Sequence, residues 1–388
     1  MDIKKLKLEG KRIFIRTDYN VVLSSQGEIL DDTRIKRGLA TVKWCSNQGG
    51  RVIIATHLGY PGGKIDSNLS TQLLVKNIEQ NLKQKIRFVN DCVGESVKDA
   101  ITSLKNGEVL LLENLRFYMG ELDNDEGFAR KLIMGYDIFI NDAFSVSHRN
   151  HASVNAINKF ANKSYFGLSL TKELSVLTNT LSRSKKSIAI IGGGWKATQK
   201  IEVVENLAKN MHFILIGGAL AQIFYIAKGI SLNNSIEIPT EKIKLATSIL
   251  ENYNNIILPV DNLTLVDKKI KNIKHSDIEQ NMQLLDIGIE TLLVFKAIIS
   301  KAEVVFWNGP LGKYEDPLFE NGTKEIATHI SNLQDVEGVI CGGDTLAAIN
   351  DFGLSKRYSY LSSAGGAALN FLAGKNMPGF ENINTDII

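Results

Sequence analysis

Cysteine is scarce in this chain of 388 residues, which contains only Cys45, Cys92 and Cys341. The three are far apart and include no C-x-x-C pair, which excludes both a disulfide framework and a cysteine-based zinc site. Such sparse usage is typical of proteins that stay in a reducing compartment. We therefore expect a cytoplasmic protein.

An excess of charge of one sign is also absent. The chain has 45 basic and 42 acidic side chains, which gives a formal net charge of +3. A balance this close to neutral argues against a broad surface for nucleic acid or another polyanion. Any anion site in this protein must therefore be local.

Long apolar runs are missing as well. Residues 213–227, FILIGGALAQIFYIA, form a nearly apolar stretch of 15 residues that holds a glycine pair and Gln222. This is short of the roughly 20 residues that span a bilayer, so we interpret it as a strand, a glycine turn and a helix. The first 12 residues lack the apolar core of a secretory signal. We expect no membrane partner.

What the chain does contain is a repeated alternation of short apolar runs and amphipathic helical patterns. The runs do not alternate with polar residues, which favours strands buried on both faces of parallel sheets and an α/β fold. The predicted strands are 12–20, 51–59, 85–91, 108–117, 136–144, 187–194, 212–219, 255–262, 303–312, 338–345 and 359–366. The predicted helices include 68–82, 123–135, 240–253 and 289–302, and the basic segment 268–275 is expected to be a solvated loop.

The length of the chain predicts two domains, because single cores stop growing at about 250–300 residues. Residues 171–187 begin as an amphipathic helix and end as a basic, polar segment, which suits a linking helix over 171–186. We expect it to join domain 1–170 to domain 187–372. Each would be a doubly wound, Rossmann-like parallel sheet between two layers of helices.

The stretch SIAIIGGGWKATQKIEVVENL at 187–207 has the form of a phosphate-binding turn between a strand and a helix. It fails as a P-loop, because Lys196 is followed by Ala197 and not by serine or threonine. Gly192, Gly194 and Ala197 match a loose dinucleotide fingerprint, which leaves a dinucleotide-dependent oxidoreductase as one alternative. Against it, the next strand ends in glycine and not in an acidic residue.

Ligands of open α/β sheets bind beyond the carboxyl ends of the strands, and the two halves carry different residues there. The first half collects cationic and polar side chains, which suit a small anion: Asp18, Asn20, Arg34, His57, Arg116, His148, Arg149 and His151. The second half collects glycines with Lys196, Lys200, Asn308, Glu315, Asp344 and Thr345, which suit phosphates and a metal. This pairing suggests phosphoryl transfer. Plainer alternatives are that Arg16 is a solvated residue at a strand end and that Asp344 caps a helix.

Taken in order, the motifs of the chain resemble those of the phosphoglycerate kinase family over nearly its whole length. In the first half these are RTDYNVVL (16–23), DDTR (31–34), HLGYPGG (57–63), LLLENLRFYMGE (110–121) and NDAFSVSHRNHAS (141–153). In the second half they are GGWKATQKI (193–201), IGGALAQIF (216–224), LPVD (258–261), WNGPLGKYE (307–315), CGGDT (341–345) and SSAGGAALNFLAGKNMPG (362–379).

The resemblance implies a monomeric, hinge-bending kinase that moves a phosphoryl group between 1,3-bisphosphoglycerate and ADP, with Mg²⁺. It implies small-molecule substrates and a C-terminal tail, about 373–388, that completes the first domain. The phosphoglycerate would contact Asp18, Tyr19, Asn20, Arg34, His57, Leu58, Gly59, Tyr60, Arg116 and Arg149. The nucleotide would contact Gly193, Gly194, Lys196, Lys200, Gly217, Gly218, Leu284, Asn308, Pro310, Glu315, Gly342, Gly343, Asp344 and Thr345. Asp344 would approach the metal, and Arg34, Lys200, Gly365 and Gly366 would stabilise the transferring group.

Of the departures from the family pattern inside these motifs, two bear most directly on ligand binding. Tyr60 occupies the position of an arginine in the H-L-G-R motif, and Trp195 occupies the position of a small residue beside the nucleotide. The loss of one charged hydrogen bond could weaken substrate binding by ~1.5–3 kcal/mol. The second alternative is therefore a nucleotide-binding relative with weakened catalysis.

Overall fold

The structure, a computed structural model, describes residues 3–182, 186–194, 197–232, 238–280, 282–362 and 364–383. The chain divides into two compact units, one of Met1–Ser175 with Asn376–Ile388 and the other of Val176–Lys375. Helix α6 (Leu168–Ser182) runs through the division. None of the helices in these described ranges is long and apolar enough to cross a membrane.

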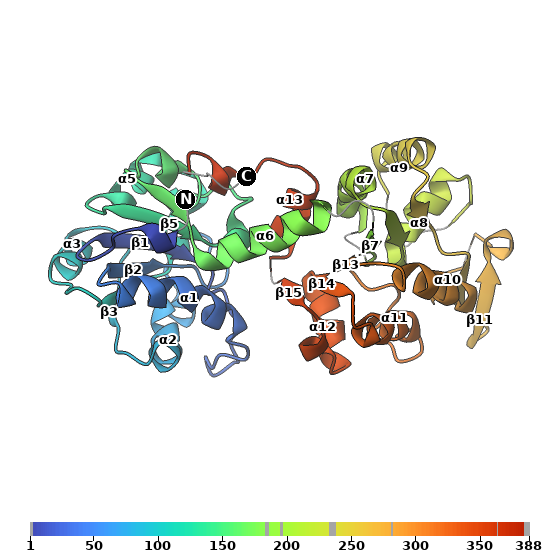
Figure 1. The fold of residues 1–388 in the computed structure, drawn as a ribbon, viewed down its shortest axis with the longest axis horizontal. Coiled ribbons are helices and arrows are strands. Elements are labelled where there is room, and N and C mark those ends of the chain that lie inside the picture. Colours follow the sequence, from blue (N-terminus) through green and yellow to red (C-terminus); the bar gives the residue numbers. More distant parts are fainter. Residues whose placement is uncertain are drawn as a thin grey trace. The chain divides into compact units, whose positions relative to one another are not determined.

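The first unit is built on a parallel sheet of six strands with the order β3-β4-β2-β1-β5-β6 (Figure 1). Every predicted strand of this half is present, but each is shorter than its apolar run because the polar end of the run is a loop. The strands are β1 (Arg12–Thr17), β2 (Arg51–Ala55), β3 (Arg87–Val89), β4 (Val109–Leu112), β5 (Ile138–Asp142) and β6 (Ser164–Phe166). The three-residue strand β6 was not predicted, since so short a run carries no period.

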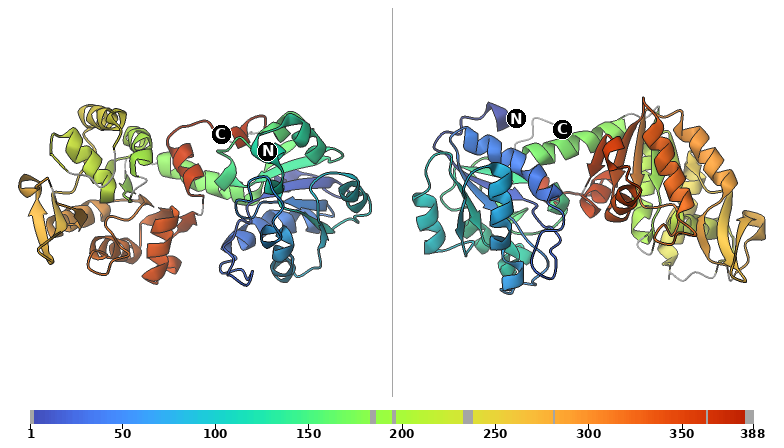
Figure 2. Two further views of the ribbon diagram at one scale, coloured as in Figure 1. Left: turned by 180° about the vertical axis from the view of Figure 1, so that it is seen from behind. Right: turned by 90° about the horizontal axis from the view of Figure 1, so that it is seen from below.

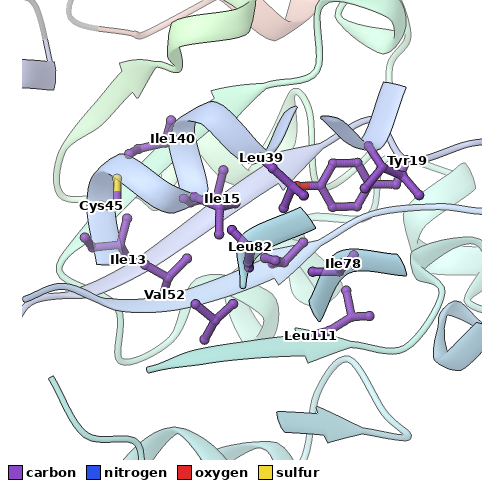
Figure 3. Close-up of a cluster of buried hydrophobic side chains, with 14 of the residues drawn as sticks. Ile13, Ile15, Tyr19, Leu39, Cys45, Val52, Ile78, Leu82, Leu111 and Ile140 are labelled. Atoms are coloured by element: carbon purple, nitrogen blue, oxygen red, sulfur yellow. The ribbon is translucent and has the colours of Figure 1, made fainter. Parts of the chain in front are cut away.

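Helices cover both faces of this sheet. Helices α1 (Thr33–Asn47) and α2 (Val75–Leu82) cover one face, where their apolar side chains meet Ile13, Ile15 and Val52 (Figure 3). Helices α3 (Glu95–Thr102) and α5 (Glu126–Ile133) cover the other, around Phe14 and Ile53. A short helix α4 (Met119–Leu122) precedes α5.

The prediction of one helix over 68–82 is wrong for its first half. That part forms two 3₁₀ turns, Ser67–Leu69 and Thr71–Leu74, and α2 begins at Val75. The side chains of Asp66 and Ser70 accept hydrogen bonds from the backbone N–H groups of Asn68 and Gln72. These local caps compete with the helical hydrogen bonds.

The second unit repeats the architecture with the strand order β15-β14-β13-β7-β8-β9. Helices α10, α11 and α12 share a core with one face of the sheet, and Figures 1 and 2 show α7 and α9 on the opposite face. The strands are β7 (Ser187–Ile191), β8 (Phe213–Ile216), β9 (Ile256–Ile257), β13 (Val304–Asn308), β14 (Glu337–Cys341) and β15 (Tyr360–Ser362). The helices are α7 (Ile201–Asn210), α8 (Gly218–Ala227), α9 (Thr240–Asn252), α10 (Ile289–Ile299), α11 (Asn321–Asn332), α12 (Gly343–Asp351) and α13 (Gly366–Leu372). The prediction of two parallel-sheet α/β domains is confirmed, as is that of a strand, turn and helix within 213–227.

The expected solvated loop at 268–275 is instead a strand. Strands β10 (Asp261–Val266) and β11 (Lys269–Lys274) form an antiparallel hairpin, which β12 (Leu284–Ile287) extends to a three-stranded sheet. Asp267 and Lys268 take φ values of 50° and 60° at the turn. Lysines are common on exposed edge strands because they discourage pairing with other chains. The lysines of β11 therefore do not distinguish an exposed edge strand from a solvated loop.

The last described residues pack on the first unit. The Nδ2 group of Asn141 donates to the Gly379 carbonyl at 2.9 Å, and that of Asn155 donates to the Pro378 carbonyl at 3.1 Å. The Phe380 ring lies edge-on to the ring of Phe166, with centroids 5.0 Å apart. These contacts assign the tail to the unit that carries β5.

Candidate functional site

Four neighbouring strands at the centre of the first sheet, β4, β2, β1 and β5, end in loops that carry polar side chains. Since the strands are parallel, these loops meet at one edge of the sheet. They bring together most of the residues that the motifs predict for the phosphoglycerate.

Arg34, from the first turn of α1, reaches the loop after β1. Its Nη1 group donates to Asp18 Oδ2 at 2.9 Å and to the Asn20 carbonyl at 3.3 Å. Asn20 Oδ1 in turn accepts from the Gly59 backbone N–H at 2.8 Å, which ties this loop to the loop after β2. The hydroxyl of Ser145 also donates to Asp18. Arg34 is thus held in place and remains half-exposed toward the edge of the sheet.

Two of the predicted residues point elsewhere. The side chains of Tyr19 and Leu58 are buried in the hydrophobic core under α1, where Figure 3 shows the Tyr19 ring. The Leu58 backbone is fixed by both polar atoms of the Asn114 side chain. Neither side chain faces the sheet edge, and the Tyr19 backbone is engaged as well, because its N–H donates to Thr56 Oγ1 at 3.0 Å and its carbonyl accepts from the Val21 N–H at 2.9 Å.

Arg116 and Arg149 carry donors that nothing in the described protein satisfies. Arg116 is 2% exposed, and its Nη1 group donates to the Gly59 carbonyl at 2.8 Å. The Nε groups of Arg116 and Arg149 are both buried without a hydrogen-bond partner among the described residues. Burial and the nearby charge of Arg149 lower the pKa of Arg116. Buried unpaired cationic donors of this kind favour an incoming anion.

Tyr60 occupies a defined place in this cluster. Its side chain is 74% exposed, and the Arg116 guanidinium lies over its ring, 4.6 Å from the centroid. A stack of this kind orients the guanidinium plane, and the Tyr60 hydroxyl partly opposes the lowering of the Arg116 pKa. Tyr60 therefore supports Arg116, although it adds no charge of its own.

The histidines of the cluster are neutral at pH 7. Burial and the neighbouring arginines lower the pKa of His148 to about 4 and that of His151 to about 3. The same two causes hold the pKa of His57 well below its usual range. The positive charge of this site consequently comes from its arginines.

The plainer alternative for Arg16, a solvated residue at a strand end, is wrong. Arg16 is fully buried. It lies in the central strand β1, where it pairs in register with Ala55 on one side and Asn141 on the other. The position of Arg16 within a strand that is buried on both faces already indicates its burial, because an arginine there cannot reach solvent.

The loops of the second unit meet at the carboxyl edge of β7, β8 and β13 through their backbone. The Gly193 N–H donates to the Pro310 carbonyl at 2.8 Å, and the Ala219 N–H donates to the Gly193 carbonyl at 2.8 Å. The Gly218 N–H donates to the Leu311 carbonyl at 2.9 Å. This brings the predicted residues Gly193, Gly217, Gly218 and Pro310 into one cluster.

Lys200 lies against these glycines. Its Nζ donates to the Gly192 carbonyl at 2.7 Å, and burial lowers its pKa to about 8, although the charge of Asp344 opposes that shift. A Cβ atom at Gly193, where φ is 120°, would lie 2.8 Å from this Nζ. A Cβ atom at Gly309, where φ is 94°, would lie 2.5 Å from it. At Gly309 a Cβ atom would also lie 2.2 Å from the Gly192 carbonyl oxygen, so backbone contact as well as the positive φ requires glycine there, whereas at Gly193 the positive φ is the stronger constraint.

Asn308 and Thr345 fix the loops after β13 and β14. The Nδ2 group of Asn308 donates to the Cys341 carbonyl at 3.0 Å, and Thr345 Oγ1 accepts from the Gly309 N–H at 2.6 Å. Both side chains are buried. They hold the start of α12 beside the glycine loops.

Asp344 lies in the first turn of α12 and is exposed. The N-cap of this helix is Gly342, which has no side chain to cap it, and the side chain of Asp344 forms no hydrogen bond with another described residue. The capping role considered for Asp344 is therefore not seen. No group of three or more His, Cys, Asp or Glu side chains that could hold a metal alone occurs among the described residues.

The remaining predicted residues are spread around this edge or lie outside it. Leu284 is half-buried in β12, Gly194, Glu315 and Gly343 are exposed, and Gly365 and Gly366 form the start of α13. The loop of Glu315 is tied to β12, because the Lys313 N–H donates to the Leu285 carbonyl at 2.8 Å. Trp195 and Lys196 lie outside the described residues.

Comparison with known proteins agrees with this geometry. The sequence pattern of the family described as phosphoglycerate kinase matches residues 3–375. The phosphoglycerate kinase of Wolbachia pipientis is 39% identical over 396 residues, which cover 98% of each chain. The chloroplastic phosphoglycerate kinase 1 of Arabidopsis thaliana is 37% identical over 97% of this chain and 80% of its own. The solved structure of phosphoglycerate kinase from Coxiella burnetii has a TM-score of 0.86 at 31% identity, over 98% of this chain and 97% of its own. This chain belongs to the phosphoglycerate kinase family.

Proposed function

We propose that this protein is the phosphoglycerate kinase of glycolysis, which transfers a phosphoryl group reversibly between 1,3-bisphosphoglycerate and ADP. The observation that carries the proposal is the pair of arginines Arg116 and Arg149, which form no ion pair with a described carboxylate and keep donors that no described residue satisfies. They share one sheet edge with Arg34 and His57 and are suited to a small molecule with several negative charges.

The phosphoglycerate would lie at the first unit. Arg34, Arg116 and Arg149 would donate to its phosphate and carboxylate oxygens, while Asp18 and Asn20 would orient its hydroxyl and Arg34 itself. His57 and Gly59 would lie beside it, while Tyr19 and Leu58 would hold the backbone of these loops in place. Neutral histidines supply hydrogen bonds there without adding charge.

The nucleotide would lie at the second unit, its phosphates over the glycine loops. The backbone of Gly193, Gly194, Gly217 and Gly218 would approach the phosphates closely because no Cβ intervenes. Lys200, together with Lys196, would neutralise them. Leu284, Asn308 and Pro310 would line the base and ribose, and exposed Glu315 would accept from the ribose hydroxyls.

The chemistry needs no protein nucleophile. In the direction of ATP use, a carboxylate oxygen of 3-phosphoglycerate bonds to the γ-phosphorus while the bond from that phosphorus to the β,γ-bridging oxygen breaks. The carboxylate is already ionised, so no base removes a proton. The task of the protein is to position the groups and to offset the charge that spreads over the transferring oxygens. Arg34, Lys200 and the backbone at Gly365 and Gly366 are the groups we assign to it.

Mg²⁺ fits the donor set of the second unit. Asp344 presents one exposed carboxylate in the first turn of α12, and Mg²⁺ commonly takes one or two carboxylates together with substrate phosphates. When bound, the ion would offset charge on the nucleotide phosphates. Residues of this chain would only anchor it.

The other parts of the proposal extend beyond the site. We propose that the enzyme is a cytoplasmic monomer with residues 1–170 and about 373–388 as its phosphoglycerate domain and 187–372 as its nucleotide domain. Hinge bending about the linking helix stays a prediction. The oxidoreductase alternative lacks an acidic residue at the end of β8, and no observation favours a weakened relative.

The proposal is tested by turnover of ATP with 3-phosphoglycerate and Mg²⁺, followed with a coupled dehydrogenase. Arg34→Ala should abolish most activity. The matched control Lys36→Ala removes a positive charge from the same helix, where Lys36 pairs only with Asp32 among the described residues, and should remain active. Turnover of NAD and none of ATP would overturn the proposal, as would equal activity in the two variants.

A further inference from the structure

A buried chain of hydrogen bonds runs from Glu121 to His57 behind the proposed phosphoglycerate site. Glu121 Oε1 accepts from the Ser153 hydroxyl at 2.7 Å, and Glu121 Oε2 accepts from the Ser153 N–H at 2.8 Å. The Ser153 hydroxyl oxygen accepts from Arg16 Nε at 2.8 Å. Arg16 Nη2 lies 3.2 Å from His57 Nδ1. Each of these four side chains is 2% exposed or less.

The direction of every bond in this chain is fixed by chemistry. Both oxygens of Glu121 accept, and although burial raises the pKa of Glu121, the charge of Arg16 and the two bonds from Ser153 oppose that shift and favour the carboxylate. Ser153 has one hydroxyl proton and gives it to Glu121, so toward Arg16 it can only accept. Arginine has donors and no acceptor, so His57 Nδ1 must accept from it.

An accepting Nδ1 decides where the imidazole proton lies. A neutral histidine has one protonated and one unprotonated nitrogen, so the proton of His57 is on Nε2. Burial and the charge of Arg16 keep the ring neutral, because they hold the pKa of His57 far below its usual range. The Nε2 group has no partner among the described residues, and it is not one of their fully buried unpartnered atoms. It is therefore open to a ligand.

Arg16 is rigid enough to impose this state. Besides the bonds to Ser153 and His57, its Nη1 group donates to the Thr17 carbonyl. All three of its nitrogens are thus engaged, and its backbone sits in the central strand β1. Arg16 is fully buried, and burial lowers the pKa of its guanidinium. The negative charge of Glu121 opposes this effect and favours the charged form of Arg16.

We propose that Glu121 and Ser153 are positioning residues which, through Arg16, lock His57 with its proton on Nε2, so that His57 offers the substrate only a hydrogen-bond donor. This inference rests on the proposed function, because it places His57 against the phosphoglycerate. A group that can only donate favours an oxyanion at that position and disfavours groups that can only donate, such as an ammonium or an amide N–H. Specificity for a carboxylate or phosphate oxygen would thus be set by buried residues that do not contact the substrate themselves.

The first test is long-range ¹H–¹⁵N NMR of the full-length protein labelled at its six histidines, with the His57 signals assigned by their loss in His57→Gln. The wild type should show a protonated Nε2 and an unprotonated Nδ1. Ser153→Ala should give a mixture of tautomers, and Ser153→Thr should restore the wild-type pattern. Ser147→Ala is the matched control, because Ser147 is equally buried in the same segment but bonds to Asn141 and Ala143. Its His57 signals should not change.

A second test does not depend on the folding of the serine variants. His57→Gln places an amide donor where Nε2 was, whereas His57→Asn keeps an acceptor for Arg16 and offers nothing to the substrate. The KM for 3-phosphoglycerate should rise about tenfold or more in His57→Asn and clearly less in His57→Gln, with a smaller change in kcat.

Several results would overturn the inference: a proton on Nδ1 in the wild type, an unchanged tautomer in Ser153→Ala, or equal KM values for the two His57 variants. Absence of turnover with phosphoglycerate would instead remove the proposed function. The NMR result would still decide whether the chain from Glu121 fixes His57, since it is recorded without substrate.

Discussion

The two units have the same architecture, and the anion sites that we propose for them are built in opposite ways. Each has six parallel strands and gathers its polar loops at one sheet edge. The first unit fills that edge with buried charged side chains, whereas the second fills it with backbone, glycine and the half-buried Lys200. The fold fixes where a ligand binds, and the loop residues decide whether side chains or main chain bind it.

This difference has a physical consequence for each site. Arginines taken out of water are unfavourable until an anion pairs with them, so the first unit trades stability for binding. The glycine loops themselves carry no charge and bury only that of Lys200. Their weakness is geometric, because a Cβ atom is strained where φ is positive and at Gly309 would meet the Gly192 carbonyl oxygen. Substitutions in each unit can separate binding by side-chain charge from binding by the glycine backbone.

The largest effect is expected for Lys200→Met, which keeps the aliphatic stem and removes the charge. We expect kcat to fall by roughly 10²–10³-fold, as for the loss of one group that stabilises developing charge. ADP affinity should change less than about tenfold, because the glycine loops still bind the phosphates. Steady-state kinetics and calorimetric titration of ADP check both numbers. An equal loss of affinity and kcat would show that the second unit also depends on side-chain charge.

Arg116→Met is the counterpart in the first unit. The KM for 3-phosphoglycerate should rise about 10–100-fold, since a buried donor to an anion contributes ~1.5–3 kcal/mol. The free protein should be as stable as the wild type or more stable, by up to about 2 kcal/mol, because the burial that lowers the pKa of Arg116 is relieved. Urea unfolding without ligand measures this. A marked loss of stability would mean that Arg116 is a structural residue.

Gly309→Ala tests the geometric mode. The new Cβ would lie 2.2 Å from the Gly192 carbonyl oxygen at a φ of 94°, so we expect a loss of about 1–3 kcal/mol in stability and weaker ADP binding. Gly229→Ala is the control, because Gly229 has a φ of 85° with nothing near its Cβ position. Thermal unfolding of the two variants separates backbone strain from the clash. Equal shifts in melting temperature would assign the whole effect to strain.

A buried carboxylate in the second unit gives a pH-dependent prediction. Burial raises the pKa of Asp286 to about 7, while its two oxygens accept from the backbone N–H groups of Ile287 and Gly322. A carboxyl whose pKa is raised by folding favours the folded state below its unfolded pKa, and that contribution is lost as pH rises through about 7. Wild-type stability should therefore fall by up to about 1.4 kcal/mol per pH unit more steeply than that of Asp286→Asn. Urea unfolding at pH 5 to 8 gives the two slopes, and parallel slopes would contradict the prediction.

How far the sequence predicts this molecule depends on whether a signal is local. The strands, the α/β class and the glycine loops follow from short apolar runs and from spacing. The burial of Arg16 and the orientation of Tyr19 depend on which strand is central and which side of a loop faces a helix, and a linear pattern does not encode that. Strand β11 was missed because its lysines are typical of a loop as well as of an exposed edge. Its pairing with β10 is a tertiary property.

The smallest effect is expected at Tyr60, where this chain departs from the family motif. If the ring acts by stacking on Arg116, Tyr60→Phe should leave the KM for 3-phosphoglycerate within about twofold, and Tyr60→Ala should raise it about 2–5-fold, since an exposed stack is worth ~0.5–1 kcal/mol. Tyr60→Arg should bind the substrate more tightly at low salt and lose that gain at high salt, because an exposed charge is screened. KM values at two salt concentrations measure all three variants. A rise in KM for Tyr60→Phe as large as for Tyr60→Ala would mean that the hydroxyl, and not the ring, contacts the substrate, and the first unit would then use a neutral donor where the family uses a charge.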